Sequence, residues 1–123
     1  MDKPPKAKPR TGVILRDLYA MATSQTEYDW KPLRDGVEIC PLYQDGADGP
    51  MAALLRYAPG ARTPPHLHQG VEFIVVLSGA QADDNGYYPA GTVFASPPGS
   101  THGIVSDIGC VVLAIWHKPV KFL

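Results

Sequence analysis

The sequence has few cysteines and no long hydrophobic run, and both shortages narrow the class of protein. Only Cys40 and Cys110 occur among 123 residues, and each lies inside an apolar run far from the other. We therefore expect neither a disulfide framework nor a cysteine-based zinc site, and we interpret both as buried free thiols. No apolar stretch is long enough to cross a bilayer, and no charged start followed by a hydrophobic run and a cleavage site is visible. We expect a cytoplasmic protein that does not bind membranes.

The chain also lacks a strong excess of one charge, since its formal net charge is −1. Four of its 11 basic residues lie within residues 1–10, beside three prolines, so this segment is predicted to be a flexible basic tail. Asp2 is one of the 12 acidic residues, so 7 basic residues remain against 11 acidic ones outside the tail. Because this mildly acidic body offers no broad cationic surface, no nucleic-acid partner is expected.

Residues 11–123 are predicted to form one all-β domain. No polar or proline-rich interval divides them. Short apolar or alternating runs are separated by turns such as Arg34-Asp35-Gly36 and Asp84-Asn85-Gly86. One short helix is predicted within Asp17–Thr26. The predicted strands are Gly12–Leu18, Tyr28–Leu33, Val37–Tyr43, Met51–Ala58, Val71–Leu77, Gly86–Tyr88, Thr92–Ala95 and Cys110–His117.

Three of the four histidines fall in two short segments, which favours a metal site. On an extended strand, residues two apart point the same way, so His66 and His68 can direct two imidazoles to one point. Glu72 follows Gly70, where a turn can bring the carboxylate back toward them. His102 follows the rigid Pro97-Pro98-Gly99 turn and would arrive from another strand. Three imidazoles and one carboxylate suit Zn(II), Fe(II), Ni(II), Cu(II) or Mn(II).

These residues carry a family resemblance. Gly60, five residues, His66-Leu67-His68, three residues, Glu72, six residues and Gly79 resemble the first cupin motif. Gly91, five residues, Pro97-Pro98-Gly99, two residues and His102 resemble the second, although Ser106 stands where that motif usually has asparagine. The resemblance implies a cupin double-stranded β-helix, a jelly-roll barrel, with one divalent metal ion. It also implies a homodimer, in which the Gly12–Leu18 run could cross to a second subunit.

A narrower resemblance, to the ChrR-type cupins, extends over most of the chain. It is carried by Asp29-Trp30-Lys31-Pro32-Leu33, by Ala52–Ala61, by Glu72–Gly79 and by Tyr88-Pro89-Ala90-Gly91-Thr92. Members of this group include the C-terminal domain of zinc-binding anti-sigma factors, and acetylacetone-cleaving dioxygenases are related to it. Because the cysteines of the helical sigma-binding domain are absent here, a stand-alone cupin is implied.

Three functions follow from such a site. An ion with open positions would suit a metal-dependent dioxygenase acting on a small diketone or aromatic ketone. A closed tetrahedral zinc site would suit a sensor or regulatory module without turnover, and a metal that only holds the fold would suit a structural barrel. The sequence favours the enzyme slightly and identifies no general acid or base beyond the four candidate ligands.

Overall fold

In the computed structural model, residues 14–23 and 29–123 are described, and nearly all of their regular structure is antiparallel β-sheet. The one helix of this part is α1 (Leu18–Thr23). The strands are β1 (Lys31–Arg34), β2 (Val37–Gln44), β3 (Met51–Tyr57), β4 (Ala61–His68), β5 (Glu72–Asp83), β6 (Gly86–Pro89), β7 (Val93–Ser96), β8 (Thr101–Ser106), β9 (Cys110–Trp116) and β10 (Val120–Phe122).

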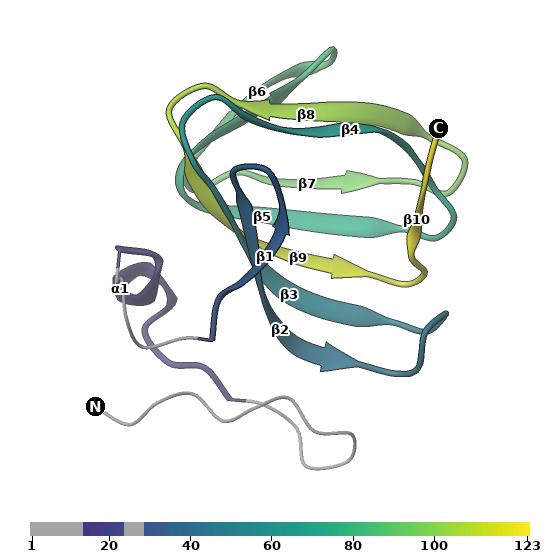
Figure 1. The fold of residues 1–123 in the computed structure, drawn as a ribbon, viewed down its shortest axis with the longest axis horizontal. Helices are drawn as coiled ribbons and strands as arrows, with labels where there is room; N and C mark the ends of the chain where they lie inside the picture. The colour runs from purple at the N-terminus through teal and green to yellow at the C-terminus, as the bar shows by residue number, and fades with distance from the viewer. Residues whose placement is uncertain (1–13, 24–28) are drawn as a thin grey trace.

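The sheet curls into two layers that face each other (Figure 1). One layer contains β1, β2, β3, β9, β5 and β7, and the other contains β6, β8, β4 and β10. The 12-residue strand β5 belongs to both: its first part pairs with β7 and β9, and its last part pairs with β6 and β8. This arrangement is the jelly-roll barrel that the sequence predicts, so the expected fold class is confirmed.

Gly79 allows β5 to pass from one layer to the other. Its φ is +69°, and a Cβ built there would lie 1.8 Å from the carbonyl oxygen of Gly109. The register against β9 also shifts between Val76 and Ser78. A residue with a side chain would therefore suffer both backbone strain and a steric clash at the bend. Gly60, Gly91 and Gly99 lie in turns, whereas Gly79 lies inside a strand.

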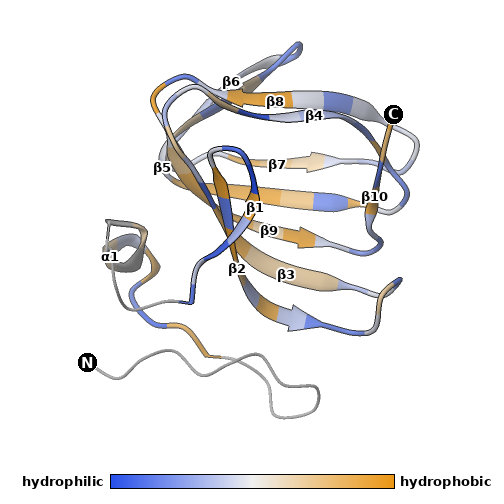
Figure 2. Cartoon of the chain, in the orientation of Figure 1, coloured by the Kyte–Doolittle hydropathy of each residue, from blue (hydrophilic) through white to orange (hydrophobic). Residues whose placement is uncertain are grey.

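The larger layer has an apolar cluster on each of its faces, and hydrophobic residues predominate along β3, β5 and β9 (Figure 2). The inner cluster, which faces the barrel interior, includes Ile74, Val76 and Val112. The outer cluster includes Leu54 and Val111, and Ala22 of α1 packs onto it. Because side chains alternate along a strand, the same strands supply both clusters.

A bulge in β4 sets the position of the histidines. The register between β4 and β8 shifts between Thr63 and His66, on either side of Pro64 and Pro65. Prolines donate no hydrogen bond to a sheet, and bulges are among the places where strands accommodate them. After the bulge, His66 lies directly opposite His102 of β8.

Ser106 makes two hydrogen bonds at the end of β8, at the position where the cupin motif usually has asparagine. Its hydroxyl donates a 2.5 Å hydrogen bond to the Ala80 carbonyl, and its own carbonyl accepts one from the Gly60 amide at 2.7 Å. Ser106 is fully buried. Serine at this position therefore ties β8 to β5 and to the β3–β4 turn.

Several predicted boundaries need correction. The Gly12–Leu18 strand is wrong over its described part, because Asp17 has a φ of +63° and α1 begins at Leu18. The leucine side chains of this segment pack on the outer cluster instead of extending a sheet edge. The short helix is confirmed, whereas the predicted tail at residues 1–10 lies outside the described residues. Within the described part, no helix is long and apolar enough to span a membrane.

The predicted strands differ from the structure mainly at the prolines and glycines. β4, β8 and β10 were not among the eight predicted runs, although the histidine pattern requires extended backbone at both histidine segments. The Val71–Leu77 run extends to Asp83, and Tyr28–Leu33 becomes Lys31–Arg34. The turns at residues 34–36, 58–60, 84–86 and 96–99 lie between strands as predicted.

Candidate metal centre

The four predicted ligands converge inside the barrel. His66 and His68 come from β4, Glu72 begins β5, and His102 comes from β8. One possible ligand atom from each residue lies within 4.8 Å of those of the others. The three imidazole centroids are 4.6 to 5.0 Å apart. The geometry is therefore that of a cluster that could hold one metal ion.

Each imidazole is oriented by a hydrogen bond from its Nδ1 atom. His66 donates to the Pro64 carbonyl at 2.8 Å, and His68 faces the Ser100 carbonyl at 3.1 Å. His102 donates to the Asp83 carboxylate at 2.9 Å. For His66 and His102, the proton of the neutral ring therefore lies on Nδ1 and the Nε2 lone pair remains available, whereas both ring nitrogens of His68 face acceptors. Such outer hydrogen bonds fix the tautomer and orientation of metal-binding histidines.

The contact between His68 and Glu72 indicates that this cluster requires a proton or a cation. His68 Nε2 lies 3.2 Å from Glu72 Oε1. When Nδ1 carries the proton, both of these atoms are acceptors, so they repel each other unless a proton or a cation lies with them. His68 is 1% exposed and Glu72 is 9% exposed, so water screens this contact poorly. The donor set of three nitrogens and one carboxylate therefore fits a divalent ion.

The pKa values of two histidines shift in opposite directions when only protons compete for the site. Burial lowers the pKa of His66, and the nearby His102 and His68 lower it further. Burial also opposes the charged form of His68, but the hydrogen bond and the negative charge of Glu72 outweigh it and raise the pKa. The carboxylate thus attracts positive charge into the centre of the cluster.

Asp83 is the outer carboxylate of the centre. Its Oδ2 accepts from His102, while its Oδ1 accepts from the Tyr88 hydroxyl at 2.7 Å and from the amides of Asn85 and Gly86. Burial opposes ionisation of Asp83, yet the hydrogen bonds from Tyr88 and His102 lower its pKa overall. Burial and the Asp83 charge together raise the pKa of Tyr88 to about 12. Asp83 therefore remains an anion that holds His102 in place.

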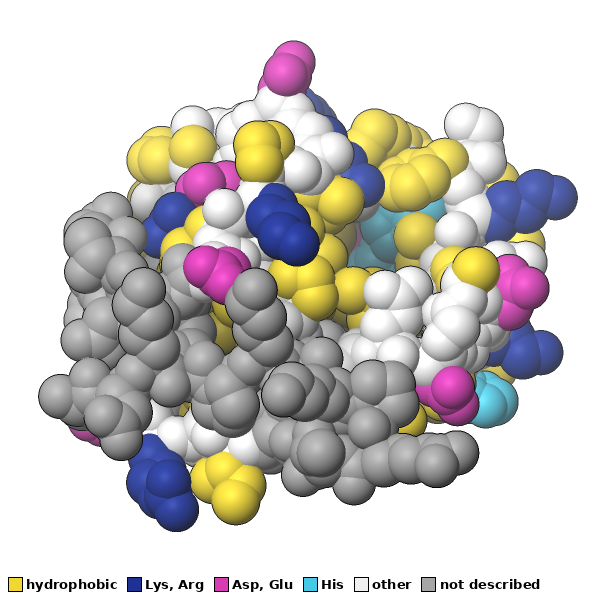
Figure 3. All heavy atoms as spheres, turned by 60° about the horizontal axis from the view of Figure 1, so that its bottom comes forward, with side chains coloured by type: hydrophobic (Ala, Val, Ile, Leu, Met, Phe, Trp, Pro, Cys, Tyr) yellow, Lys and Arg dark blue, Asp and Glu magenta, His cyan; other side chains and the backbone are white. Residues whose placement is uncertain are grey.

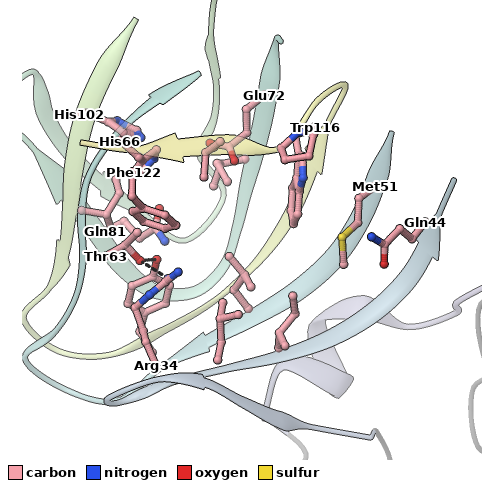
Figure 4. A pocket seen from close by; sticks show the side chains of 18 of the residues that line it. Arg34, Gln44, Met51, Thr63, His66, Glu72, Gln81, His102, Trp116 and Phe122 are labelled. Carbon is pink, nitrogen blue, oxygen red and sulfur yellow. Dashed lines mark hydrogen bonds between the residues drawn. The ribbon is translucent and has the colours of Figure 1, made fainter. Parts of the chain in front are cut away.

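A cavity of about 370 Å³ opens onto three of the four side chains. His66, Glu72 and His102 line it, whereas His68 lies behind them. Figure 3 shows histidine at the bottom of a hollow that is surrounded by hydrophobic side chains. Figure 4 shows Trp116 and Met51 along the same cavity, with Arg34, Gln81 and Thr63 on its wall. An ion in the cluster would face the cavity, where a small ligand can enter.

Sequence reasoning left the roles of several residues open or missed them. Tyr57 and Trp116 line the cavity, and Phe94 packs against the inner cluster and stacks on Tyr88. Arg56 instead pairs with Glu38 and covers the Trp30 ring. His117 is exposed, as expected for a residue outside the site.

Arg34, Gln81 and Asp83 were not predicted. Gln81 lies beyond the apolar run that ends at Leu77, between Ala80 and Ala82, so the sequence does not indicate that it is buried. Nothing in the sequence distinguishes Asp83 from the exposed Asp84, because the register of the bent strand decides which one faces His102.

The curled antiparallel barrel and its cluster of three histidines and one glutamate define the molecule as a cupin. The family model for the ChrR cupin-like domain matches residues 19–121. The chain therefore belongs to the ChrR cupin-like family.

Known relatives agree with this assignment. The anti-sigma-E factor ChrR of Cereibacter sphaeroides is 29% identical over 119 residues, which cover 95% of this chain and 54% of that protein. The chain thus spans about half the length of this relative. In the crystal structure of Rhodobacter sphaeroides SigE with the anti-sigma ChrR, the similar region has a TM-score of 0.68 at 28% identity and covers 76% of this chain and 52% of that one.

An acetylacetone dioxygenase from Acinetobacter johnsonii shares the fold. Its TM-score is 0.73 at 13% identity, and the match covers 82% of this chain and 76% of that one.

Proposed function

We propose that this protein is a metal-dependent dioxygenase-type enzyme acting on a small diketone or aromatic ketone. The observation that supports this proposal most is the position of the cluster at the end of an open cavity. His66, Glu72 and His102 line the cavity, so a metal held by the four residues would keep one side available to a ligand. A structural metal site is usually closed by its protein ligands instead.

The chemistry supplied by such an ion is polarisation of a ketone oxygen and, for iron, electron exchange with dioxygen, whose two oxygen atoms enter the product. The residues of the chain would hold the substrate and exclude bulk water. Leu55, Ile74 and Trp116 form apolar cavity wall suited to an alkyl or aromatic ketone. The acetylacetone dioxygenase that shares the fold supports the choice of diketones as first substrates.

The second candidate is a zinc-binding regulatory module without turnover. It is favoured by the similarity to the anti-sigma factor ChrR over 95% of the chain. In this case, the cavity ligand would be a signal, and the ion would keep the barrel in a shape that a protein partner recognises. A sigma factor is the first partner to test, because the ChrR structure contains SigE.

Metal analysis and oxygen uptake separate the two functions. The protein is purified without added metal or chelator, its metals are measured, and the iron-reconstituted form is assayed in an oxygen electrode with acetylacetone and benzoylacetone. Stoichiometric iron and oxygen uptake that is lost in Glu72→Ala would support the enzyme. Stoichiometric zinc with no oxygen uptake, even after exchange for iron, would contradict the enzyme and favour the regulator. Melting on chelation without either property would indicate a structural metal.

A further inference from the structure

We propose that the cavity selects a ligand with a carboxylate at one end, bound by Arg34, and a hydroxyl or enol group bound by Gln81. This inference rests on the proposed function, since it names the ligand class of the same cavity. Neither residue belongs to the cluster that could hold the metal.

Arg34 is a cation on the cavity wall that has no acidic partner among the described residues. It ends β1, donates a 3.1 Å hydrogen bond from Nη1 to Thr63 Oγ1, and lies with its guanidinium carbon 5.1 Å from the centre of the Phe122 ring. Within residues 14–23 and 29–123, no carboxylate forms an ion pair with it. By contrast, Arg56 outside the cavity pairs with Glu38 at 2.7 Å. Arg34 thus retains donors for a carboxylate, which arginine binds with well-defined geometry.

The charge of the cavity favours the same class of ligand. Arg34 is the one cationic side chain among the described lining residues, and Glu72 is the one carboxylate. A divalent ion at the cluster would exceed the charge of Glu72. The loaded cavity would therefore be positive, and an anionic ligand would neutralise it.

Gln81 supplies a second, independent observation. It is 2% exposed and lines the cavity, yet its Oε1 atom has no hydrogen-bond partner in the described part of the chain. A buried acceptor without a partner is uncommon, so we expect a donor in the cavity to form a hydrogen bond with Gln81 Oε1. An enol or alcohol hydroxyl of a bound ligand has this chemistry.

The distances agree with one small molecule that reaches from the cluster to Arg34. The Phe122 ring lies 5.8 Å from the His66 ring and 5.1 Å from the Arg34 guanidinium carbon, so a single aromatic ring separates the two ends. The cavity volume of about 370 Å³ is at the lower end of the usual range for ligand sites. A diketone with a short carboxylate arm would fit this description, whereas a macromolecule would not.

The test measures binding rather than turnover. Zinc-loaded protein is titrated by calorimetry with succinylacetone, a diketone that carries a terminal carboxylate, and with its uncharged methyl ester. We expect the acid to bind about tenfold or more tightly than the ester, the range of a charged hydrogen bond. Arg34→Met should reduce this preference to near one, and Arg34→Lys should retain part of it. Arg62→Met, which removes an exposed arginine, is the matched control and should leave the preference unchanged.

Gln81→Leu should weaken the acid and the ester to the same extent, because both share the diketone. An equal affinity for acid and ester in the wild type, or a preference that survives Arg34→Met at full size, would overturn the carboxylate site. Unchanged affinities in Gln81→Leu would overturn the role of Gln81.

Hexanoate separates this inference from the proposed function, because it has the carboxylate but no diketone. If the diketones fail to bind while hexanoate binds in an Arg34-dependent way, the diketone substrate is wrong and the carboxylate site stands. If hexanoate and succinylacetone both bind independently of Arg34, the carboxylate site is wrong while the metal centre stands. Binding of neither acid would also overturn the carboxylate site. Metal content is measured in every variant, since loss of the ion would change all affinities together.

Discussion

Leu54 and Leu55 are neighbours on β3, but they lie on opposite faces of the same layer. Leu54 belongs to the outer cluster and is fully buried. Leu55 packs against the inner cluster and borders the cavity. The outer face is a closed apolar contact with α1, whereas the inner face leaves room beside charged and polar side chains. The comparison indicates that the outer face contributes mainly stability, and that the inner face gives up packing for a binding site.

The largest expected effect is on metal binding at the inner face. His102→Ala or Glu72→Ala should lower the affinity for a divalent ion by more than about 100-fold, beyond the effect typical of outer hydrogen-bond partners. Calorimetric titration with zinc measures this change. His117→Ala removes an exposed histidine and serves as the control. Unchanged affinity in either ligand variant would remove that residue from the centre.

Truncation at the outer face should affect stability instead. Leu54→Ala is expected to lower the free energy of unfolding by about 2–5 kcal/mol, because a fully buried leucine leaves a cavity in a packed cluster. Leu55 already borders the cavity, so Leu55→Ala should lower the free energy of unfolding by less than about 2 kcal/mol. Urea unfolding of both variants measures the difference. Equal losses would mean that the two faces are packed equally well.

The sequence predicts some strands of the barrel better than others. β2 and β3 were predicted nearly to their ends, because mainly apolar runs lie between clear turn residues. β4 was not predicted as a run, since its two prolines argue against a strand unless a bulge accommodates them. The N-terminal apolar residues suggested a strand, but whether they extend an edge or cover a face depends on tertiary packing.

The residues of the site also divide into those that the sequence predicted and those that it did not. His66, His68, Glu72 and His102 were predicted because scarce residues recur at a spacing that brings them together. Asp83 and Gln81 follow the bend of β5 at Gly79, where the strand changes layers and partners. Arg34 depends on the contact between β1 and Phe122 of β10, which are the first and last strands along the described chain. No short-range pattern in the sequence contains that information.

A change in the outer hydrogen bonds of the centre should have a moderate effect. Asp83→Asn removes the negative charge that holds His102 and should lower metal affinity by about 10–100-fold. Secondary structure, followed by circular dichroism, should be retained. Asp84→Asn changes the exposed neighbour and should leave the affinity unchanged. Equal affinities in the two variants would show that Asp83 does not support the centre.

The smallest expected effect concerns the link between the layers. Ser106→Ala removes the hydrogen bond to the Ala80 carbonyl and leaves that buried acceptor without its partner. We expect a loss of about 1 kcal/mol in the free energy of unfolding, with metal affinity unchanged. Thermal unfolding and zinc titration measure the two quantities. A loss of metal affinity would mean that the strand end and the centre are coupled.

The central claim is that four residues of this barrel hold one metal ion at the end of a cavity. X-ray absorption at the metal edge, on protein purified without added metal or chelator, tests it most directly. The account predicts about one ion per chain, with a first shell of three imidazole nitrogens and at least one oxygen. Protein without a bound ion, or a first shell without imidazole, would contradict it.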